Sequence, residues 1–126
     1  MIPIVLPGFD YLINTRKLTE ETIRIFHLSY IDQHGLCYID ADFTGTLPQL
    51  DLRFKNSAMF PIFSVYGDVV GVSARPLVTI PGTKYINTVY EKGDHLYGLN
   101  QTWKYCLEAK KAYVVEGNID TMMMWQ

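Results

Sequence analysis

Two apolar runs joined by a Gly-Asp turn constrain the fold of this chain more than any other feature. Residues 59–66 and 69–75 are rich in aliphatic and aromatic side chains, and Gly67 and Asp68 between them are turn formers. This pattern predicts an antiparallel β-hairpin. Pro61 has no N–H to donate to a neighbouring strand, so we expect it at a sheet edge or at a bulge.

Helix and strand signals surround the hairpin. Helical periodicity covers residues 9–14 and 18–26, and it returns from Asn100 or Thr102 through Lys111. In the second of these segments Thr19 is a suitable N-cap, and the acidic residues that follow it suit the positive end of a helix. Further strands are predicted at residues 36–40 and, after a Pro81-Gly82 turn, at 84–88.

The last segment of the sequence combines an apolar run with two carboxylates. Residues 113–115 predict a buried strand, Glu116 stands at its carboxyl end, Gly117 makes a turn, and Asp120 follows as a helix begins. Ligands of open α/β sheets bind at the carboxyl ends of strands, so this pattern is typical of a metal or phosphate site. The apolar side of the expected helix, formed by Ile119, Met122, Met123 and Trp125, would have little to cover it.

Charge is unevenly distributed along the chain. The net charge of the 126 residues is −2, but residues 51–115 carry eight basic and five acidic side chains, whereas residues 116–126 carry two acidic ones and no basic ones. A basic surface beside an acidic site is what a metal-dependent enzyme acting on phosphates requires. A solvated surface of mixed sign explains the same balance.

Length and the remaining composition favour one compact, intracellular unit. The hydrophobic content of 48% is enough for one core, no run approaches the length needed to span a bilayer, and the first residues lack a secretory signal. Cys37 and Cys106 are far apart and have no metal-ligand spacing, so we expect both thiols to be buried.

Basic and polar side chains near the hairpin are candidates for binding phosphates. Arg53 and Arg75 flank the hairpin, and Lys84, Tyr85 and Asn87 place a cation, an aromatic ring and an amide within four residues. Such a set can hold a phosphate and a sugar, although packing alone also explains it.

Taken together, the sequence motifs resemble those of the DnaG-type primases of bacteria and phages. Residues 18–23 with Phe26 and Tyr30 are similar to the opening helix of that family, although Ser29 replaces a glycine. The other similar segments follow in the family's order: 53–56 with 59–62, 67–72 with Arg75, 84–88, 92–93 with 96–99, and 115–120, which resembles the Val-Glu-Gly-Tyr-Met-Asp motif that opens a toprim fold.

The resemblance implies a fold class and a division of the chain. We expect an α+β fold in which a small mixed or antiparallel sheet with flanking helices runs into the first strand and helix of an α/β toprim fold. Residues 1–111 would form the amino-terminal subdomain of the primase core, with a basic face for template and nucleotide. Residues 112–126 would begin a truncated toprim domain.

The resemblance also implies an activity, which is the template-directed synthesis of short RNA primers on single-stranded DNA. Glu116 and Asp120 would be the catalytic and metal-binding carboxylates for Mg²⁺ or Mn²⁺. The residues that would bind nucleic acid and nucleotide are Arg53, Arg75, Lys84, Tyr85, Asn87 and Lys92. Ribonucleoside triphosphates and a replicative helicase would be partners, in the cytoplasm of a bacterium or phage-infected host and without contact with a membrane.

Parts of the family's pattern are missing from this sequence. The later toprim aspartates and the zinc module have no counterpart, so we expect no zinc site and an incomplete metal site. The chain would then be a fragment, or a split subunit that a second polypeptide completes. The alternative is a non-catalytic subunit that binds single-stranded DNA or a replication protein. An unrelated toprim enzyme, such as a topoisomerase or nuclease, is disfavoured because it offers no place for residues 59–62 and 84–87.

Overall fold

The protein forms an antiparallel sheet with helices on one side. In the computed structural model, residues 6–40, 43, 45–78 and 84–126 are described. The strands are β1 (Ser29–Ile31), β2 (Cys37–Tyr38), β3 (Ser57–Phe63), β4 (Val69–Pro76) and β5 (Ile86–Asn87). They pair in the order β2-β1-β3-β4-β5, and every pairing is antiparallel. This arrangement confirms the expected α+β class.

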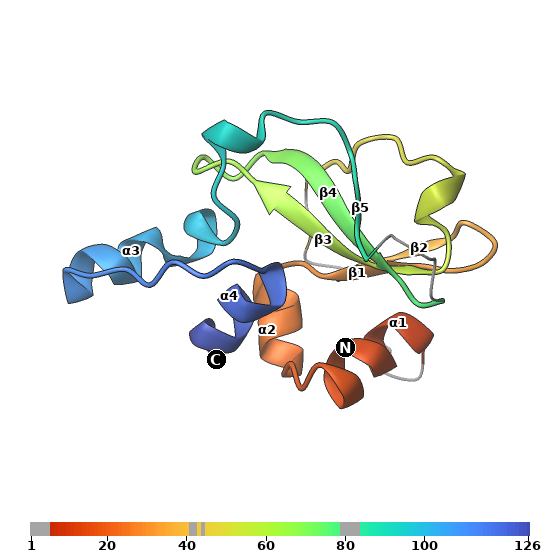
Figure 1. The fold of residues 1–126 in the computed structure, drawn as a ribbon, viewed down its shortest axis with the longest axis horizontal. Helices are drawn as coiled ribbons and strands as arrows, with labels where there is room; N and C mark the ends of the chain where they lie inside the picture. The colour runs from red at the N-terminus through yellow and green to blue at the C-terminus, as the bar shows by residue number, and fades with distance from the viewer. Residues whose placement is uncertain (1–5, 41–42, 44, 79–83) are drawn as a thin grey trace.

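The helices lie outside the sheet. They are α1 (Pro7–Asp10), which continues into the π-helical turn η1 (Tyr11–Thr15), α2 (Glu20–Ile25), α3 (Leu99–Ala109) and α4 (Asn118–Trp125). Two short 3-10 turns, η2 (Leu52–Phe54) and η3 (Lys92–Asp94), interrupt the loops. Figure 1 shows α1, α2 and α4 together below the sheet, whereas α3 projects from one end of the molecule. Among the described residues, no helix is both long and apolar enough to cross a bilayer.

The predicted hairpin is confirmed as β3 and β4. Phe60 pairs with Ser73, and the ladder extends from Ser57 opposite Pro76 to an irregularity at Ile62/Phe63. Pro61 lies beyond the part of β3 that pairs with β1 and immediately before that irregularity, where a missing N–H is tolerated. Its expected position is therefore also confirmed.

Side-chain alternation in β3 divides the core into two layers. Ala58 and Phe60 point to the helical side, whereas Met59 points to the other side. The layer on the helical side consists of Phe9, Leu12, Leu18, Ile23, Phe26, Leu28, Tyr30, Ala58, Phe60, Ile119 and Met122. The other layer consists of Ile31, Phe54, Met59, Val72, Ala74 and Ile86. Because both faces of β3 are covered, its whole apolar run from Ser57 to Ile62 is buried.

The two helices that flank this core are joined at their ends. Thr19 is the N-cap of α2 as predicted, and its hydroxyl accepts a hydrogen bond from the Thr22 N–H at 3.1 Å. The side-chain amide of Gln126, which follows α4, accepts hydrogen bonds from the Thr19 N–H and the Thr22 hydroxyl, both at 3.0 Å. It also donates to the carbonyl of Lys17 at 2.9 Å. These bonds hold the end of α4 against the start of α2.

Three sequence expectations are wrong. Residues 113–116 form no strand, and Tyr113 and Val114 are largely exposed, because a buried strand needs neighbouring strands and none of the described residues pairs with this segment. The apolar side of α4 is covered in part, since Ile119 and Met122 are buried in the core and Trp125 is half-buried, whereas Met123 is exposed. Neither thiol is buried, because Cys37 lies exposed in the outermost strand β2 and Cys106 is half-buried on α3.

Two further differences concern strands. The predicted strand at 36–40 is shorter, and β1 has no counterpart in the predictions. The predicted Pro81-Gly82 turn lies outside the described residues.

Candidate nucleic-acid interface and acidic site

Strand register gathers several of the candidate residues on one face of the sheet. Arg75 pairs with Ala58 of β3, whose side chain points to the helical side. Asn87 pairs with Ser73, two residues before Arg75, so Asn87 and the preceding Tyr85 point to that same side. The pairing of β4 with β5 therefore brings Arg75, Tyr85 and Asn87 together at the β5 edge of the sheet, on its helical side.

The ring of Tyr85 supports the guanidinium of Arg75. The guanidinium carbon lies 5.5 Å from the centroid of the Tyr85 ring. The ring itself is half-buried, with its centroid 6.1 Å from that of Phe60. A guanidinium stacked on an aromatic ring still has its N–H groups free to donate to a phosphate. Because the ring of Tyr85 is half-buried, it also holds the Arg75 guanidinium in place. Lys84 is exposed directly beside this pair.

A second cation and ring lie near the same face. The ammonium nitrogen of Lys92, in η3, is 5.9 Å from the centroid of the Tyr90 ring. Tyr90 in turn covers Gly71 of β4, where a Cβ atom would come within 2.6 Å of the ring. Gly71 and Arg75 are four residues apart on β4, so their side-chain positions face the same side of the sheet. Tyr90, which covers Gly71, therefore packs on the helical side as well. Tyr90 was not predicted from the sequence as a binding residue, although an aromatic residue two positions before a lysine was a usable signal.

Arg53 is placed differently. It lies on η2 and forms a salt bridge with Asp51 at 2.8 Å, the only one among the described residues. The hydrogen bonds from the Arg53 guanidinium hold the pKa of the Asp51 carboxyl below its usual range. The next residue, Phe54, packs in the layer on the opposite side of the sheet from Phe60. The structure therefore does not bring Arg53 together with Arg75.

The two candidate carboxylates flank the start of α4. Glu116 and Asp120 are both exposed, and Gly117 between them is the N-cap of the helix. A Cβ atom on Gly117 would lie 3.1 Å from a carboxylate oxygen of Asp120, so glycine leaves room for that side chain. The position of Asp120 in the first turn also suits its negative charge.

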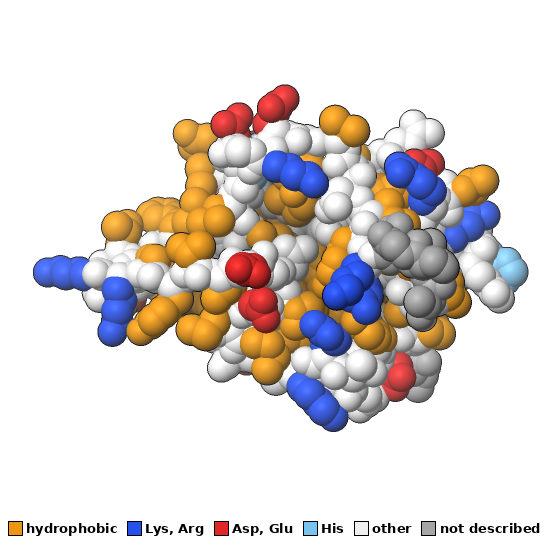
Figure 2. All heavy atoms as spheres, viewed as in Figure 1, with side chains coloured by type: hydrophobic (Ala, Val, Ile, Leu, Met, Phe, Trp, Pro, Cys, Tyr) orange, Lys and Arg blue, Asp and Glu red, His pale blue; other side chains and the backbone are white. Residues whose placement is uncertain are grey.

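Tyr97 connects the acidic segment to the core, since its ring stacks on that of Phe26 with centroids 6.0 Å apart. The Tyr97 hydroxyl donates a hydrogen bond to the sulfur of Met122 on α4 at 3.9 Å. Burial raises the pKa of the Tyr97 hydroxyl, and the neighbouring Tyr85 adds to this shift. On the face seen in Figure 2, acidic side chains lie near the start of α4 with Lys and Arg side chains beside them.

The described residues do not complete a metal site. Carboxylate oxygens suit Mg²⁺ and Mn²⁺, which accept one or two carboxylates together with phosphate oxygens. Among the described residues, however, no group of three or more His, Cys, Asp and Glu side chains could hold a metal ion. Glu116 and Asp120 supply two carboxylates of the right chemistry, and such an ion would need further ligands besides them.

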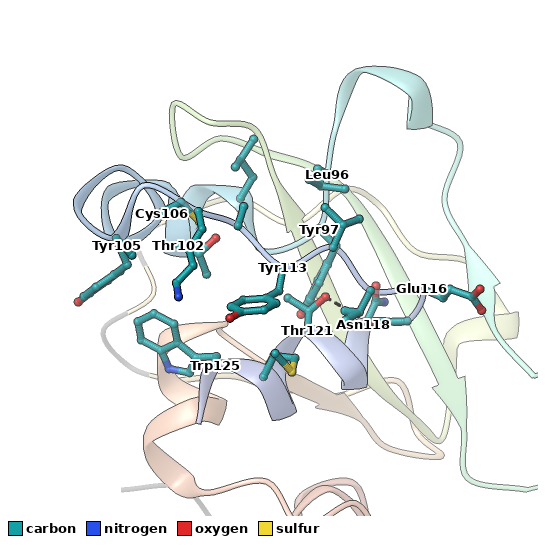
Figure 3. Close-up of a pocket in the computed structure, with 18 residues that line it drawn as sticks. Leu96, Tyr97, Thr102, Tyr105, Cys106, Tyr113, Glu116, Asn118, Thr121 and Trp125 are labelled. Carbon is teal, nitrogen blue, oxygen red and sulfur yellow. Dashed lines mark hydrogen bonds between the residues drawn. The ribbon is translucent and has the colours of Figure 1, made fainter.

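A largely apolar cavity of about 480 Å³ lies beside the carboxylates. It is bounded by α3, the segment 111–117 and α4, with Tyr105, Tyr113 and Trp125 among its lining residues. In Figure 3 the carboxylate of Glu116 points away from this cavity. The cavity therefore adjoins the acidic turn without enclosing the Glu116 carboxylate. It was not predicted from the sequence, although an apolar run without partner strands was a signal for it.

Comparisons with known proteins agree on one family. Residues 45–103 match the family described as DNA primase catalytic core, N-terminal domain. A DNA primase of Buchnera aphidicola is 39% identical over 140 residues, covering 94% of this chain and 24% of that protein. The Escherichia coli primase catalytic core superposes with a TM-score of 0.71 at 26% identity, covering 98% of this chain and 45% of that structure.

A second solved structure contains nucleic acid. The DnaG primase catalytic domain bound to ssDNA superposes with a TM-score of 0.68 at 23% identity, covering 98% of this chain and 46% of that structure. At that identity the similarity shows the fold. The chain spans between 12% and 26% of the length of eight curated DNA primases that it matches.

Proposed function

This chain carries the amino-terminal part of a DnaG-type primase catalytic core, and from that premise we propose that it binds template and nucleotide in RNA primer synthesis. Single-stranded DNA would be the template, and ribonucleoside triphosphates would be the substrates. The observation that carries this proposal is the placement of Arg75 on the ring of Tyr85, on the same side of the sheet as the acidic helix α4.

The basic face fits the binding of phosphates. Arg75, Lys84 and Lys92 supply positive charge, and Asn87 supplies an amide, within one region of the sheet edge. The rings of Tyr85 and Tyr90 offer faces on which cations are held and bases can stack. Arg53, which shares its guanidinium with Asp51, would contribute less.

The acidic residues would act at the reacting phosphate. Glu116 would serve as acid or base or help to organise the metal, and Asp120 would support it from the first turn of α4. A bound Mg²⁺ or Mn²⁺ would offset the negative charge of the triphosphate during phosphoryl transfer. Because the described residues offer two carboxylates here, further ligands must come from other polypeptide.

The exposed segment before Glu116 is a suitable place for that further polypeptide. Among the described residues, none forms a hydrogen bond with the backbone of residues 112–116, and Tyr113 and Val114 are 69% and 75% exposed. Unpaired backbone groups and apolar side chains are characteristic of a strand that lacks its neighbours. We therefore propose that residues 112–126 begin a toprim domain, which continues the same chain or is supplied by a second one, and that residues 1–111 form the preceding subdomain.

The proposed activity also implies a setting. Primer synthesis takes place where DNA is replicated, so we place the protein in the cytoplasm of a bacterial cell or a phage-infected host. A replicative helicase is a further partner that the activity implies.

The 126-residue chain alone is expected to bind single-stranded DNA without making primers, because two carboxylates do not form a two-metal site. The measurement combines fluorescence anisotropy of a labelled oligonucleotide with incorporation of radiolabelled ribonucleotides in Mg²⁺ or Mn²⁺. Primer-length RNA from the purified chain would contradict the proposed incompleteness. Absence of any salt-sensitive binding would contradict the assignment of the basic face.

A further inference from the structure

The contact between the start of α3 and the start of α4 is unusually close. Gly98, the N-cap of α3, is buried and has a φ of +82°, a conformation that favours glycine. A Cβ atom at this position would lie 2.6 Å from the methyl carbon of Thr121 and 3.4 Å from the ring of Phe26. The absence of a side chain at residue 98 therefore allows the first turn of α4 to approach α3.

Local hydrogen bonds hold the two sides of this contact. On α4, the Thr121 hydroxyl donates to the carbonyl of Gly117 at 3.2 Å, and the Thr121 N–H donates to the same carbonyl at 3.0 Å. On α3, the Thr102 hydroxyl donates to the carbonyl of Gly98 at 2.8 Å. Thr121 is thus bound to the residue between Glu116 and the helix, and a displacement of Thr121 would displace the acidic turn.

Tyr97 extends the contact toward the basic face. Its ring stacks on Phe26 with centroids 6.0 Å apart, and its hydroxyl bonds to the sulfur of Met122. Tyr85, the ring that supports Arg75, packs on Phe60 with centroids 6.1 Å apart, in the same core layer as Phe26. The rings of Tyr85 and Tyr97 therefore pack against the same core layer that buries Ile119 and Met122 of α4.

We propose that Tyr97 and Gly98 are positioning residues, which fix Glu116 and Asp120 relative to the basic face by setting where the first turn of α4 lies. The importance of this placement for catalysis rests on the proposed function, whereas the placement itself does not. Neither residue is among those assigned to nucleic acid, nucleotide or metal. Their role is to keep the carboxylates of Glu116 and Asp120 at a fixed distance from the basic face.

Methionine-methyl NMR tests this placement without DNA, nucleotide or metal. The Met122 methyl is bonded to the sulfur that Tyr97 contacts, so its chemical shift reports the position of α4 on that ring. The exposed Met124 on the same helix is the matched control. In Gly98→Ala, the new methyl group against Thr121 should shift the Met122 resonance clearly and leave that of Met124 nearly unchanged.

A second substitution separates positioning from stability. Thr121→Ser removes the methyl group in the contact but keeps the hydroxyl that bonds to Gly117. In Gly98→Ala/Thr121→Ser, the Met122 resonance should return at least halfway, while the urea midpoint stays low because alanine remains strained at a φ of +82°. Should Gly98→Ala not fold, Thr121→Ile enlarges the same contact from α4 without backbone strain at residue 98, and the same Met122 shift is expected.

Two outcomes would overturn the inference. One is a Met122 resonance that stays in place in Gly98→Ala or Thr121→Ile, and the other is a shift that Thr121→Ser does not reverse. A separate assay connects the placement to function. With the remainder of a primase core added, Gly98→Ala should lower the primer synthesis rate about 100-fold, as a misplacement of roughly 1 Å can, with DNA affinity within about twofold. No primer synthesis by the unaltered protein in that assay would count against the proposed function and leave the NMR result standing.

Discussion

Replacing Arg75, Lys84 and Lys92 together with alanine is expected to weaken binding of single-stranded DNA and to make it less sensitive to salt. Each phosphate that a cation neutralises adds about 0.7 to the slope of log affinity against log salt concentration for a single strand. Loss of three such contacts should lower that slope by about 2. Anisotropy titrations of a labelled oligonucleotide at several salt concentrations measure it directly.

The matched control removes the same charge from another part of the surface. Lys104, Lys110 and Lys111 are exposed on or just after α3, away from the face that carries Arg75. Their triple alanine variant should change the slope much less, because its lysines lie outside the proposed interface. Equal losses in the two variants would mean that DNA responds to net charge alone and would contradict a localised interface.

Met122→Ala is expected to destabilise the fold by about 2 to 5 kcal/mol, the usual loss when a large buried side chain is truncated. Met122 is fully buried in the layer that also contains Phe26 and Phe60. Met124→Ala, the same substitution two residues later on α4, should change the free energy of unfolding by no more than about 0.5 kcal/mol because that side chain is 55% exposed. Urea denaturation followed by circular dichroism measures both values.

This pair of variants tests whether α4 packs on the core of this chain. A small and equal effect of both substitutions would mean that the helix is detached in solution. The placement of Glu116 and Asp120 on the same side of the sheet as Arg75 would then be lost as well.

Local sequence patterns predicted the helices and strands whose own residues show a turn, a cap or a regular apolar pattern. The hairpin was predictable because two apolar runs flank Gly67-Asp68, and α2 was predictable because Thr19 precedes a helical stripe. Strand β1 was not, because its three residues, Ser29 to Ile31, are too few to show alternation and are all buried between neighbouring strands. The strand predicted at 113–115 had the right composition, but strand formation depends on partners that the described residues do not supply.

The sequence predicted which residues belong to the candidate site, but it did not predict how they are arranged in space. Arg75 and Tyr85 are ten positions apart, and only the β4–β5 register places one on the other. Nothing in the sequence distinguishes Arg53 from Arg75, although the fold directs them to different regions. Tyr97 and Gly98 carry no chemical signal of a site, since their importance arises from how closely α3 and α4 pack.

The most direct test of the proposed function is primer synthesis by the 126-residue chain mixed with the part of a related primase core that follows the matched region. The mixture is expected to make short RNA primers on single-stranded DNA in Mg²⁺ or Mn²⁺, neither component alone should do so, and Glu116→Gln should abolish the product. Primers from the chain alone would contradict the proposed incompleteness of its acidic site. A mixture that forms a stable complex and makes no primers, or whose product is indifferent to Glu116→Gln, would contradict the proposed function.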